Sequence, residues 1–390
     1  MNLCAFLAPE GIPRGILRQW DRVTGANELN KAIAALTRYS LVEATPESLS
    51  VHRLVQEITR QRLSDADRRT FAEAAVRIIN NAFPENSNDV RTWPDCARLL
   101  PHAQAVSDHA EQLEVAREAT SRLLNEFGIY LYGHARFVEA KQAFERALAI
   151  GEAAYGSDHP QVAIYVNNLG NVLQDLGNLP AAKLAFERAL TIGEAAYGPN
   201  HPTVAIRVNN LGNVLRDLGN LQAAKQAFER ALRIQEAVYG SNHPMVAIDV
   251  NNLGDVLQAL GDLHAAKQAY ERALAIGEAA YGPAHPNVAP FVNNMGGVLR
   301  DLGDLPAAKQ AFERAITIDE AAYGPNHPNV AIDVNNLGDV LQALGDLHAA
   351  KQACERALKI FRYYLGDEHP NTQRVLRNLQ SVEDEIRRRR

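Results

Sequence analysis

From about residue 121 onward, apolar residues recur three and four positions apart in paired stretches, with polar residues between them. In the stretch Gln161–Gly198 the first apolar stripe consists of Val166, Leu169, Val172, Leu173 and Leu176. The second consists of Ala182, Phe186, Ala189 and Leu190. This spacing predicts one buried face on each of two helices. Gly177-Asn178 supplies the turn between them, and Gly198 ends the second helix.

The predicted helix pair repeats along the chain with a constant period. His-Pro pairs 42 residues apart mark the register at His159, His201, His243, His285, His327 and His369. Small residues such as Gly170 and Ala182 allow the two backbones to approach closely, and Phe186 fills the space beside them. The sequence therefore predicts six 42-residue units over 121–370, stacked as a solenoid in which each unit contacts its neighbours.

These units resemble the tetratricopeptide repeat in Leu169-Gly170, Leu173, Ala182, Phe186 and Ala189. The resemblance runs from Ser121 to the C-terminus and implies an all-α, right-handed superhelical solenoid. The longer period, the Asn167-Asn168-Leu169 run and the terminal His-Pro resemble the kinesin-light-chain type. The chain departs from the shorter standard unit because Glu194 stands where a closing proline is usual, so we expect a longer second helix.

Residues 1–63 do not follow the repeat. Ile16, Leu17 and Trp20 predict one helix, and a second is expected over Glu28–Thr37. Two short strands, Ser40–Ala44 and Leu49–His52, flank the turn Thr45-Pro46-Glu47-Ser48. A basic helix over Arg53–Leu63 follows. Helices followed by a small hairpin predict a winged-helix-like domain.

This N-terminal segment is similar to the winged-helix end of NB-ARC-type STAND signalling ATPases. The matching stretches are Phe6-Leu7-Ala8-Pro9-Glu10, Tyr39-Ser40-Leu41 and Val51-His52-Arg53-Leu54-Val55-Gln56. The resemblance implies that His52 contacts a nucleotide, although Arg53 stands where the family has an aspartate. No G-x-x-x-x-G-K-[ST] loop occurs, so we expect no ATP hydrolysis by this polypeptide. An upstream nucleotide-binding domain is the further partner that the resemblance implies.

Residues 64–120 are expected to form a helical connector that caps the first repeat. Helices are predicted over Phe71–Ala82, Ala97–Val106 and Leu113–Leu124, with breaks at Trp93-Pro94 and Pro101. Residues 371–390 predict a C-terminal capping helix. Its apolar face comprises Val375, Leu376, Leu379, Val382 and Ile386.

Composition narrows the class of protein. The net charge of −6 does not suggest a nucleic-acid or anionic-membrane surface. The three cysteines, Cys4, Cys96 and Cys354, lack metal or disulfide spacing, which is typical of a reducing compartment. With neither a signal peptide nor a long apolar run, we expect a cytoplasmic protein that binds neither nucleic acid nor membrane.

Enzymatic chemistry has little support, because the acidic residues repeat with the scaffold instead of converging on one site. The six His-Pro histidines could suggest a metal site. However, equivalent points on successive helix pairs lie at least roughly 8–10 Å apart, and a Zn–N bond is about 2 Å. We expect these histidines to start helices, and we expect no metal, no cofactor and no catalytic residue.

Tandem asparagines are the strongest functional signal. Asn167-Asn168 recurs as Asn209-Asn210, Asn251-Asn252, Asn293-Asn294 and Asn335-Asn336. Asparagine is a poor residue for a helix interior. One interpretation is that an amide of each pair bonds between neighbouring helices; the other is that one faces a concave groove and binds a peptide backbone. First-helix asparagines line the peptide groove in proteins of the kinesin-light-chain type, which favours the second.

Chemistry varies between units at two further first-helix positions, which the helical spacing places near the asparagines. The predicted groove residues are Asn167, Asn171, Gln174, Asn209, Asn213, Arg216, Asn251, Asp255, Gln258, Asn293, Arg300, Asn335, Asp339 and Gln342. We expect a mildly acidic groove interrupted by Arg207, Arg216 and Arg300. The leading function is non-catalytic binding of a protein or peptide in this groove. The alternative is the sensor portion of an ATP/ADP-switched signalling protein whose nucleotide domain lies outside this chain.

Overall fold

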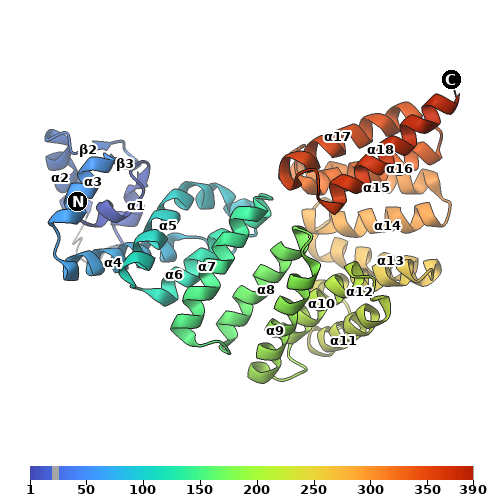
Figure 1. Ribbon diagram of the computed structural model, residues 1–390, viewed down its shortest axis with the longest axis horizontal. Helices are drawn as coiled ribbons and strands as arrows, with labels where there is room; N and C mark the ends of the chain where they lie inside the picture. The colour runs from blue at the N-terminus through green and yellow to red at the C-terminus, as the bar shows by residue number, and fades with distance from the viewer. Residues whose placement is uncertain (20–25, 390) are drawn as a thin grey trace. The chain divides into compact units, whose positions relative to one another are not determined.

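The computed structural model describes residues 1–19 and 26–389 and separates into two compact units. Unit 1 comprises Met1–Gly133 and Phe137–Asn168, and unit 2 comprises His134–Arg136 and Leu169–Arg390. The boundary falls inside helix α8 (Pro160–Asp175), so this helix contributes residues to both units. Helices dominate both units, which confirms the all-α prediction (Figure 1).

The N-terminal module of unit 1 contains the predicted hairpin and its flanking helices. Its elements are η1 (Leu3–Phe6), β1 (Ile12–Pro13), α1 (Arg14–Leu17), α2 (Ala26–Arg38), β2 (Val42–Ala44), β3 (Ser48–Val51) and α3 (Arg53–Arg62). The antiparallel sheet has the order β1-β3-β2, with Val42 opposite Val51 and Ile12 opposite Leu49. Strand β1 has two residues, too few to show a period in sequence. The predicted helical role of Trp20 lies outside the described residues.

Helices α4 (Asp65–Ala82), α5 (Trp93–Leu113), α6 (Arg117–Gly133) and α7 (Phe137–Tyr155), with the short η2 (Val90–Thr92), complete most of unit 1. Two predictions here are wrong. Pro101 lies inside α5, which continues because Leu99, Leu100, Ala103 and Val106 are buried on its core side. The predicted helix Leu113–Leu124 is interrupted, because Glu114 and Ala116 adopt left-handed φ values of 53° and 49°.

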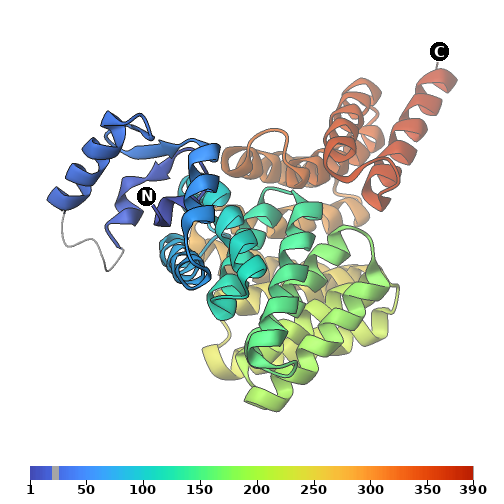
Figure 2. The same cartoon turned by 60° about the vertical axis from the view of Figure 1, so that its left-hand side comes forward.

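Unit 2 is a stack of helix pairs, which follow one another from green to red in Figures 1 and 2. After the end of α8 come α9 (Leu179–Tyr197), α10 (Pro202–Asp217), α11 (Leu221–Tyr239), α12 (Pro244–Ala259), α13 (Leu263–Tyr281), η3 (Pro286–Val288), α14 (Ala289–Asp301), α15 (Leu305–Tyr323), α16 (Pro328–Ala343), α17 (Leu347–Leu365) and α18 (Pro370–Arg389). The second helices run past the Glu194 position to a glycine, as predicted.

In every helix pair of unit 2 except the last, a glycine and an aromatic ring approach each other closely. A Cβ atom on Gly254 of α12 would lie 2.7 Å from Tyr270 Cε1 on α13, closer than a Cβ can come. Gly170 has the same relation to Phe186, at 2.6 Å, as predicted from their spacing. In the last pair Cys354 replaces the ring and is fully buried. Larger residues at these glycines would overpack the pair.

The His-Pro histidines begin the first helices. His243 Nδ1 accepts a hydrogen bond from the backbone N–H of Met245 at 3.3 Å, which satisfies one of the free donors of α12. His201, His285 and His327 cap their helices in the same way. The His243 ring also stacks on Tyr239 from the preceding helix, with centroids 4.4 Å apart. The histidines thus have the helix-start role that their proline neighbours predict.

Helix α18 packs against α16 and α17. Val375 and Val382 are fully buried in one core cluster with Phe361 and Leu358 of α17. Leu376, Leu379 and Ile386 pack against the edge of the same cluster. The apolar face of α18 therefore covers the last helix pair.

Candidate partner-binding groove

Unit 2 has an open cavity of about 870 Å³ that is lined mainly by its first helices. Eight of the predicted groove residues line it: Gln174, Arg216, Asp255, Gln258, Asn293, Arg300, Asn335 and Asp339. The others, Asn167, Asn171, Asn209, Asn213, Asn251 and Gln342, do not. On one side the cavity is bounded where His369 Nε2, at the start of α18, lies 2.5 Å from the carbonyl oxygen of Asp175. The lining residues come from successive units because each unit places its first helix on this side.

The asparagines form a ladder between neighbouring first helices. Asn252 Nδ2 donates to Asn209 Oδ1 at 2.7 Å, and Asn294 Nδ2 donates to Asn251 Oδ1 at 3.2 Å. Asn336 Nδ2 donates to Asn293 Oδ1 at 3.1 Å in the next step. In these three steps the second asparagine of a pair donates to the first asparagine of the preceding repeat. Both asparagines of a pair take part in the stack.

The peptide-binding role predicted for the first asparagine of each pair stays a prediction, and the ladder limits how much of these amides is accessible. Asn209, Asn251 and Asn335 are only 6%, 5% and 1% exposed. Their burial follows from the packing of the next unit, whose second asparagine covers the amide. Asn293 is half-buried and lines the cavity, as does the buried Asn335.

Two rungs of the ladder lie outside the tandem pairs. Asn378 Nδ2 of α18 donates to Asn335 Oδ1 at 3.1 Å, and in unit 1 Asn168 Nδ2 donates to Asn125 Oδ1 at 2.8 Å. Neither Asn125 nor Asn378 was predicted, because neither belongs to an Asn-Asn pair. Glu126 follows Asn125, and Arg377 precedes Asn378. Counting 42 residues back from Asn167 and forward from Asn336 would have found both.

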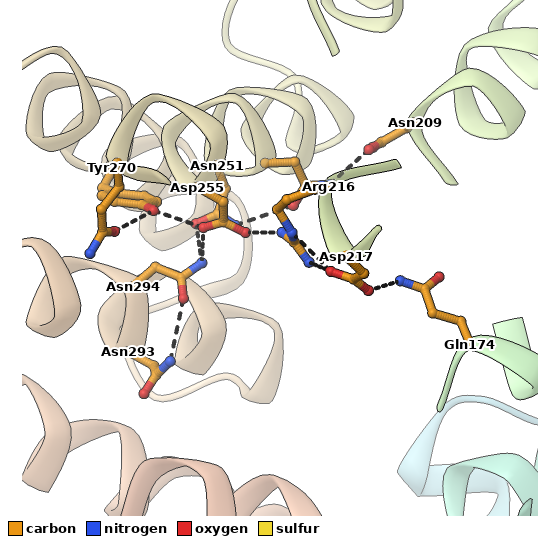
Figure 3. A network of polar contacts seen from close by, with 11 residues as sticks. Gln174, Asn209, Arg216, Asp217, Asn251, Asp255, Tyr270, Asn293 and Asn294 are labelled. Carbon is orange, nitrogen blue, oxygen red and sulfur yellow. Dashed lines mark hydrogen bonds and ion pairs between the residues drawn. The ribbon is translucent and has the colours of Figure 1, made fainter. Parts of the chain in front are cut away.

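A chain of charged and amide groups connects successive repeats of unit 2 along the cavity wall (Figure 3). Gln174 Nε2 donates to Asp217 Oδ2 at 2.5 Å, and Arg216 donates to Asp217 Oδ1 at 3.1 Å. Arg216 also binds Asp255 of the next first helix, which accepts from the Tyr270 hydroxyl at 2.8 Å. Burial raises the pKa of the Asp255 carboxyl, and the Arg216 charge opposes that rise. The carboxylate is thus held by a guanidinium and a phenol.

The same arrangement recurs 84 residues further on. Gln258 Nε2 donates to Asp301 Oδ2 at 2.6 Å, Arg300 donates to Asp301 Oδ1 at 2.9 Å, and Arg300 lies 3.6 Å from Asp339. The variable positions are therefore arginine or glutamine partners of aspartates in the next unit. Asp217 and Asp301 were not predicted to contribute, although they alternate with Ala259 and Ala343 at the same position.

A second polar layer lies between the second helix of one unit and the first helix of the next. It includes Arg207, which is buried and does not line the cavity. The prediction that Arg207 interrupts the groove is therefore wrong. Burial raises the pKa of Asp249 to about 8, and an Asn209 hydrogen bond opposes this rise. Burial likewise raises the pKa of Asp333 to about 8 and that of Asp319 to about 7. These side chains belong to the scaffold, since none of the four lines the cavity.

His52, the predicted nucleotide contact, is the N-cap residue of α3. Its Nδ1 accepts from the backbone N–H of Leu54 at 3.2 Å, and the side chain is exposed. With Glu10, Glu43 and Arg53 it lines a separate cavity of about 680 Å³ in the N-terminal module. Helix capping accounts for the ring orientation.

Within residues 1–19 and 26–389, no helix combines the length and apolarity needed to cross a bilayer. The same residues contain no group of three or more His, Cys, Asp or Glu side chains placed to hold a metal ion.

The tetratricopeptide repeat model matches six overlapping stretches of the sequence. These are residues 119–195, 161–237, 203–279, 244–320, 289–352 and 331–386. A model for a domain of unknown function, DUF7779, matches residues 1–68.

One curated relative is a nucleotide-binding leucine-rich repeat (NLR)-like protein of Hyaloscypha variabilis, 29% identical over 167 residues. That match covers 41% of this chain and 16% of the relative, so the chain corresponds to about a sixth of the relative's length.

Solved structures with a similar fold include the apo form of RapI, with a TM-score of 0.55, 17% identity and coverage of 68% of this chain and 92% of RapI. A Rap protein complexed with Competence and Sporulation Factor gives a TM-score of 0.50, 16% identity and coverage of 96% and 99%. BtubC from P. vanneervenii gives 0.45, 22% identity and coverage of 61% and 94%.

Proposed function

The chain belongs to the tetratricopeptide repeat family, and on that premise we propose that unit 2 is a non-catalytic module that binds a segment of a partner protein in its cavity. The observation that supports this proposal is the cavity of about 870 Å³, with side chains from successive first helices along its wall. A surface built from repeated helices suits an extended segment, which can contact one unit after another.

The chemistry of the wall also supports recognition without catalysis. Arg216 and Arg300 are each paired with carboxylates of the scaffold, so neither is positioned as a lone reactive group. Side-chain amides such as Asn293 and Gln258 supply donors and acceptors of the kind that bind a peptide backbone. Ile332 adds apolar surface to the same wall.

The test blocks the cavity without disturbing the scaffold. Arg374 is an exposed residue of α18 that lines the cavity. Short peptides are selected from a displayed random library on the full chain, and their affinities are measured for the wild type and for Arg374→Trp. We expect the indole to fill space that the peptide needs and to weaken binding at least about tenfold, or about 1.4 kcal/mol.

The matched control is Leu184→Trp, at a 68% exposed helical position that does not line the cavity. It should leave both peptide affinity and thermal unfolding unchanged. Failure to select any peptide, or equal binding to Arg374→Trp and the wild type, would show that the cavity is not the binding site.

A second candidate function is the sensor portion of an ATP/ADP-switched signalling protein in a reducing, cytoplasmic setting. The observation in its favour is the match to an NLR-like relative of which this chain covers only a part. In that function His52 and the cavity beside it would face the nucleotide-binding domain. The gene sequence immediately upstream separates the two candidates: an in-frame phosphate-binding loop would favour the sensor function, and its absence the autonomous binding module.

A further inference from the structure

One groove position lacks a side chain in a single unit. Asn171, Asn213, Asp255, Gly297 and Asp339 occupy it in successive first helices. A Cβ atom on Gly297 would meet one atom, Gln258 Nε2, at an ordinary contact distance of 3.6 Å. Close packing therefore does not require glycine here, although glycine inside a helix costs about 0.5–1 kcal/mol relative to alanine. Gly297 also lines the cavity, so the missing side chain leaves a notch in its wall.

The ladder shows what the notch lacks. Asn294 Nδ2 donates to two acceptors, Asn251 Oδ1 and Asp255 Oδ1, the latter at 2.9 Å. Asn378 Nδ2 likewise donates to Asn335 Oδ1 and to Asp339 Oδ1, the latter at 2.8 Å. In both cases the second acceptor is the groove residue of the preceding unit.

Asn336 is the equivalent residue on α16, and the groove residue of its preceding unit is Gly297. Its Nδ2 donates to Asn293 Oδ1 at 3.1 Å, but glycine offers no second acceptor. Asn336 lines the cavity, so its remaining N–H can reach a group inside it. Gln258 Nε2 lies at the other side of the notch. The notch therefore presents hydrogen-bond donors, which an acceptor oxygen of a bound ligand would satisfy.

The repeat pattern indicates an uncharged acceptor. Asp255 pairs with Arg216 of the preceding repeat, and Asp339 pairs with Arg300 of the preceding repeat. Each of these two groove carboxylates therefore has an arginine beside it. The residue that precedes Gly297 in this relation is Gln258, which carries no charge. A carboxylate in the notch would also approach those of Asp255 and Asp339 without an arginine of its own. A carbonyl oxygen of an amide satisfies the donors without that repulsion.

We propose that the notch at Gly297 receives an Asn or Gln side chain of the partner segment, whose carbonyl oxygen accepts from Asn336 Nδ2. The proposal rests on the proposed function of the cavity and adds the chemistry of one partner residue. Gly297 thereby sets a specificity that the other units cannot, because their groove side chains occupy the equivalent space.

The test supplies the missing amide from the chain itself. Gly297→Asn places in α14 the residue that α10 carries at Asn213. Peptides selected from the random library on the wild type should carry Asn or Gln at one constant position. We expect Gly297→Asn to weaken their binding at least about tenfold while the melting temperature is maintained, because asparagine is no worse than glycine in a helix.

A double-mutant cycle separates occupation of the notch from an indirect effect. Changing the constant Asn or Gln of the peptide to Asp or Ala should weaken binding to the wild type by a similar factor. The same peptide changes should have little further effect on Gly297→Asn, because the contact is already lost. The control Leu184→Asn adds an amide outside the cavity and should bind like the wild type.

The outcomes distinguish the two proposals. Peptides that lose affinity for Arg374→Trp but bind Gly297→Asn as tightly as the wild type would overturn the notch and leave the groove in place. Selection of an acidic, basic or aliphatic residue at the constant position, or additive effects in the cycle, would also overturn it. If no selected peptide responds to Arg374→Trp, the proposed function itself fails.

Discussion

Replacing Asn209, Asn251 and Asn293 together with alanine is expected to lower the free energy of unfolding by about 1–7 kcal/mol. Each change removes the acceptor of one ladder bond and leaves the amide of Asn252, Asn294 or Asn336 without that partner. A buried group left unsatisfied costs about 1–3 kcal/mol. The better helix propensity of alanine offsets only about 0.6 kcal/mol at each site. Urea unfolding followed by circular dichroism measures the change.

A matched triple variant tests whether the ladder, and not asparagine content, is responsible. Asn200, Asn242 and Asn326 recur in the same register but are exposed in loops before the histidine caps. Replacing these three with alanine should leave the unfolding curve unchanged. The complementary set Asn252, Asn294 and Asn336 removes the donors of the same three bonds and should destabilise like the first set. An unchanged curve for either ladder variant would contradict a structural ladder.

The second large effect concerns two buried carboxyl groups, Asp319 of α15 and Asp333 of α16. They are 5% and 4% exposed, and among the described residues Asp319 Oδ1 and Asp333 Oδ2 have no hydrogen-bond partner. Equivalent positions hold Gly193 with Arg207 and Gly277 with Phe291, where a small residue faces a large one. The α15–α16 interface instead holds two acids, which can be buried at low cost only while protonated.

We expect Asp333→Asn to stabilise the protein at pH 8 and to have little effect near pH 4. Burial raises the pKa of Asp333 from 3.8 to about 8 in the folded state. The folded state therefore holds the proton more tightly than the unfolded state, and stability falls as the pH rises from about 4 to about 8. Asparagine keeps the shape without the charge. Since a tenfold difference in proton affinity between the two states corresponds to about 1.4 kcal/mol, the gain at pH 8 should be on the order of 2–5 kcal/mol.

Denaturant unfolding across this pH range measures the effect. The wild type should lose stability toward pH 8, and Asp333→Asn should lose distinctly less. Asp158→Asn, in an exposed loop, is the control and should follow the wild-type profile. Parallel profiles for Asp333→Asn and the wild type would show that protonation of Asp333 does not contribute to the pH dependence of the stability.

The sequence predicted the helix pairs well because their signals are local. The stripe Leu169, Val172 and Leu173, the turn at Gly177 and the terminal Gly198 all lie within one unit and repeat. Where a helix end depends on packing, local signals failed. Pro101 lies inside α5 because a buried face keeps the helix intact, and the left-handed Glu114 ends it where no glycine marks a stop.

The candidate site was only partly predictable. Gln174, Arg216, Asp255 and Arg300, which helical spacing singled out, line the cavity, and their binding role stays a prediction. It could not show that Arg216 and Arg300 are occupied by aspartates of the next unit, because such pairs join residues 39 apart on separate helices. The alternation of these pairs with a period of 84 residues is present in the sequence. That the paired residues are in contact is evident only once neighbouring first helices lie side by side.

The sequence by itself therefore determined the period, the helix pairs, their caps and the family. Only the tertiary structure decided which asparagine is buried, since adjacent residues on a helix point about 100° apart and the edge of the buried face is set by the next unit. The same holds for Gly297. In the sequence Gly297 is only a weak helix former. The structure gives it another meaning, because Asp255 and Asp339 at the equivalent positions accept from Asn294 and Asn378, and among the described residues Asn336 has only the Asn293 acceptor.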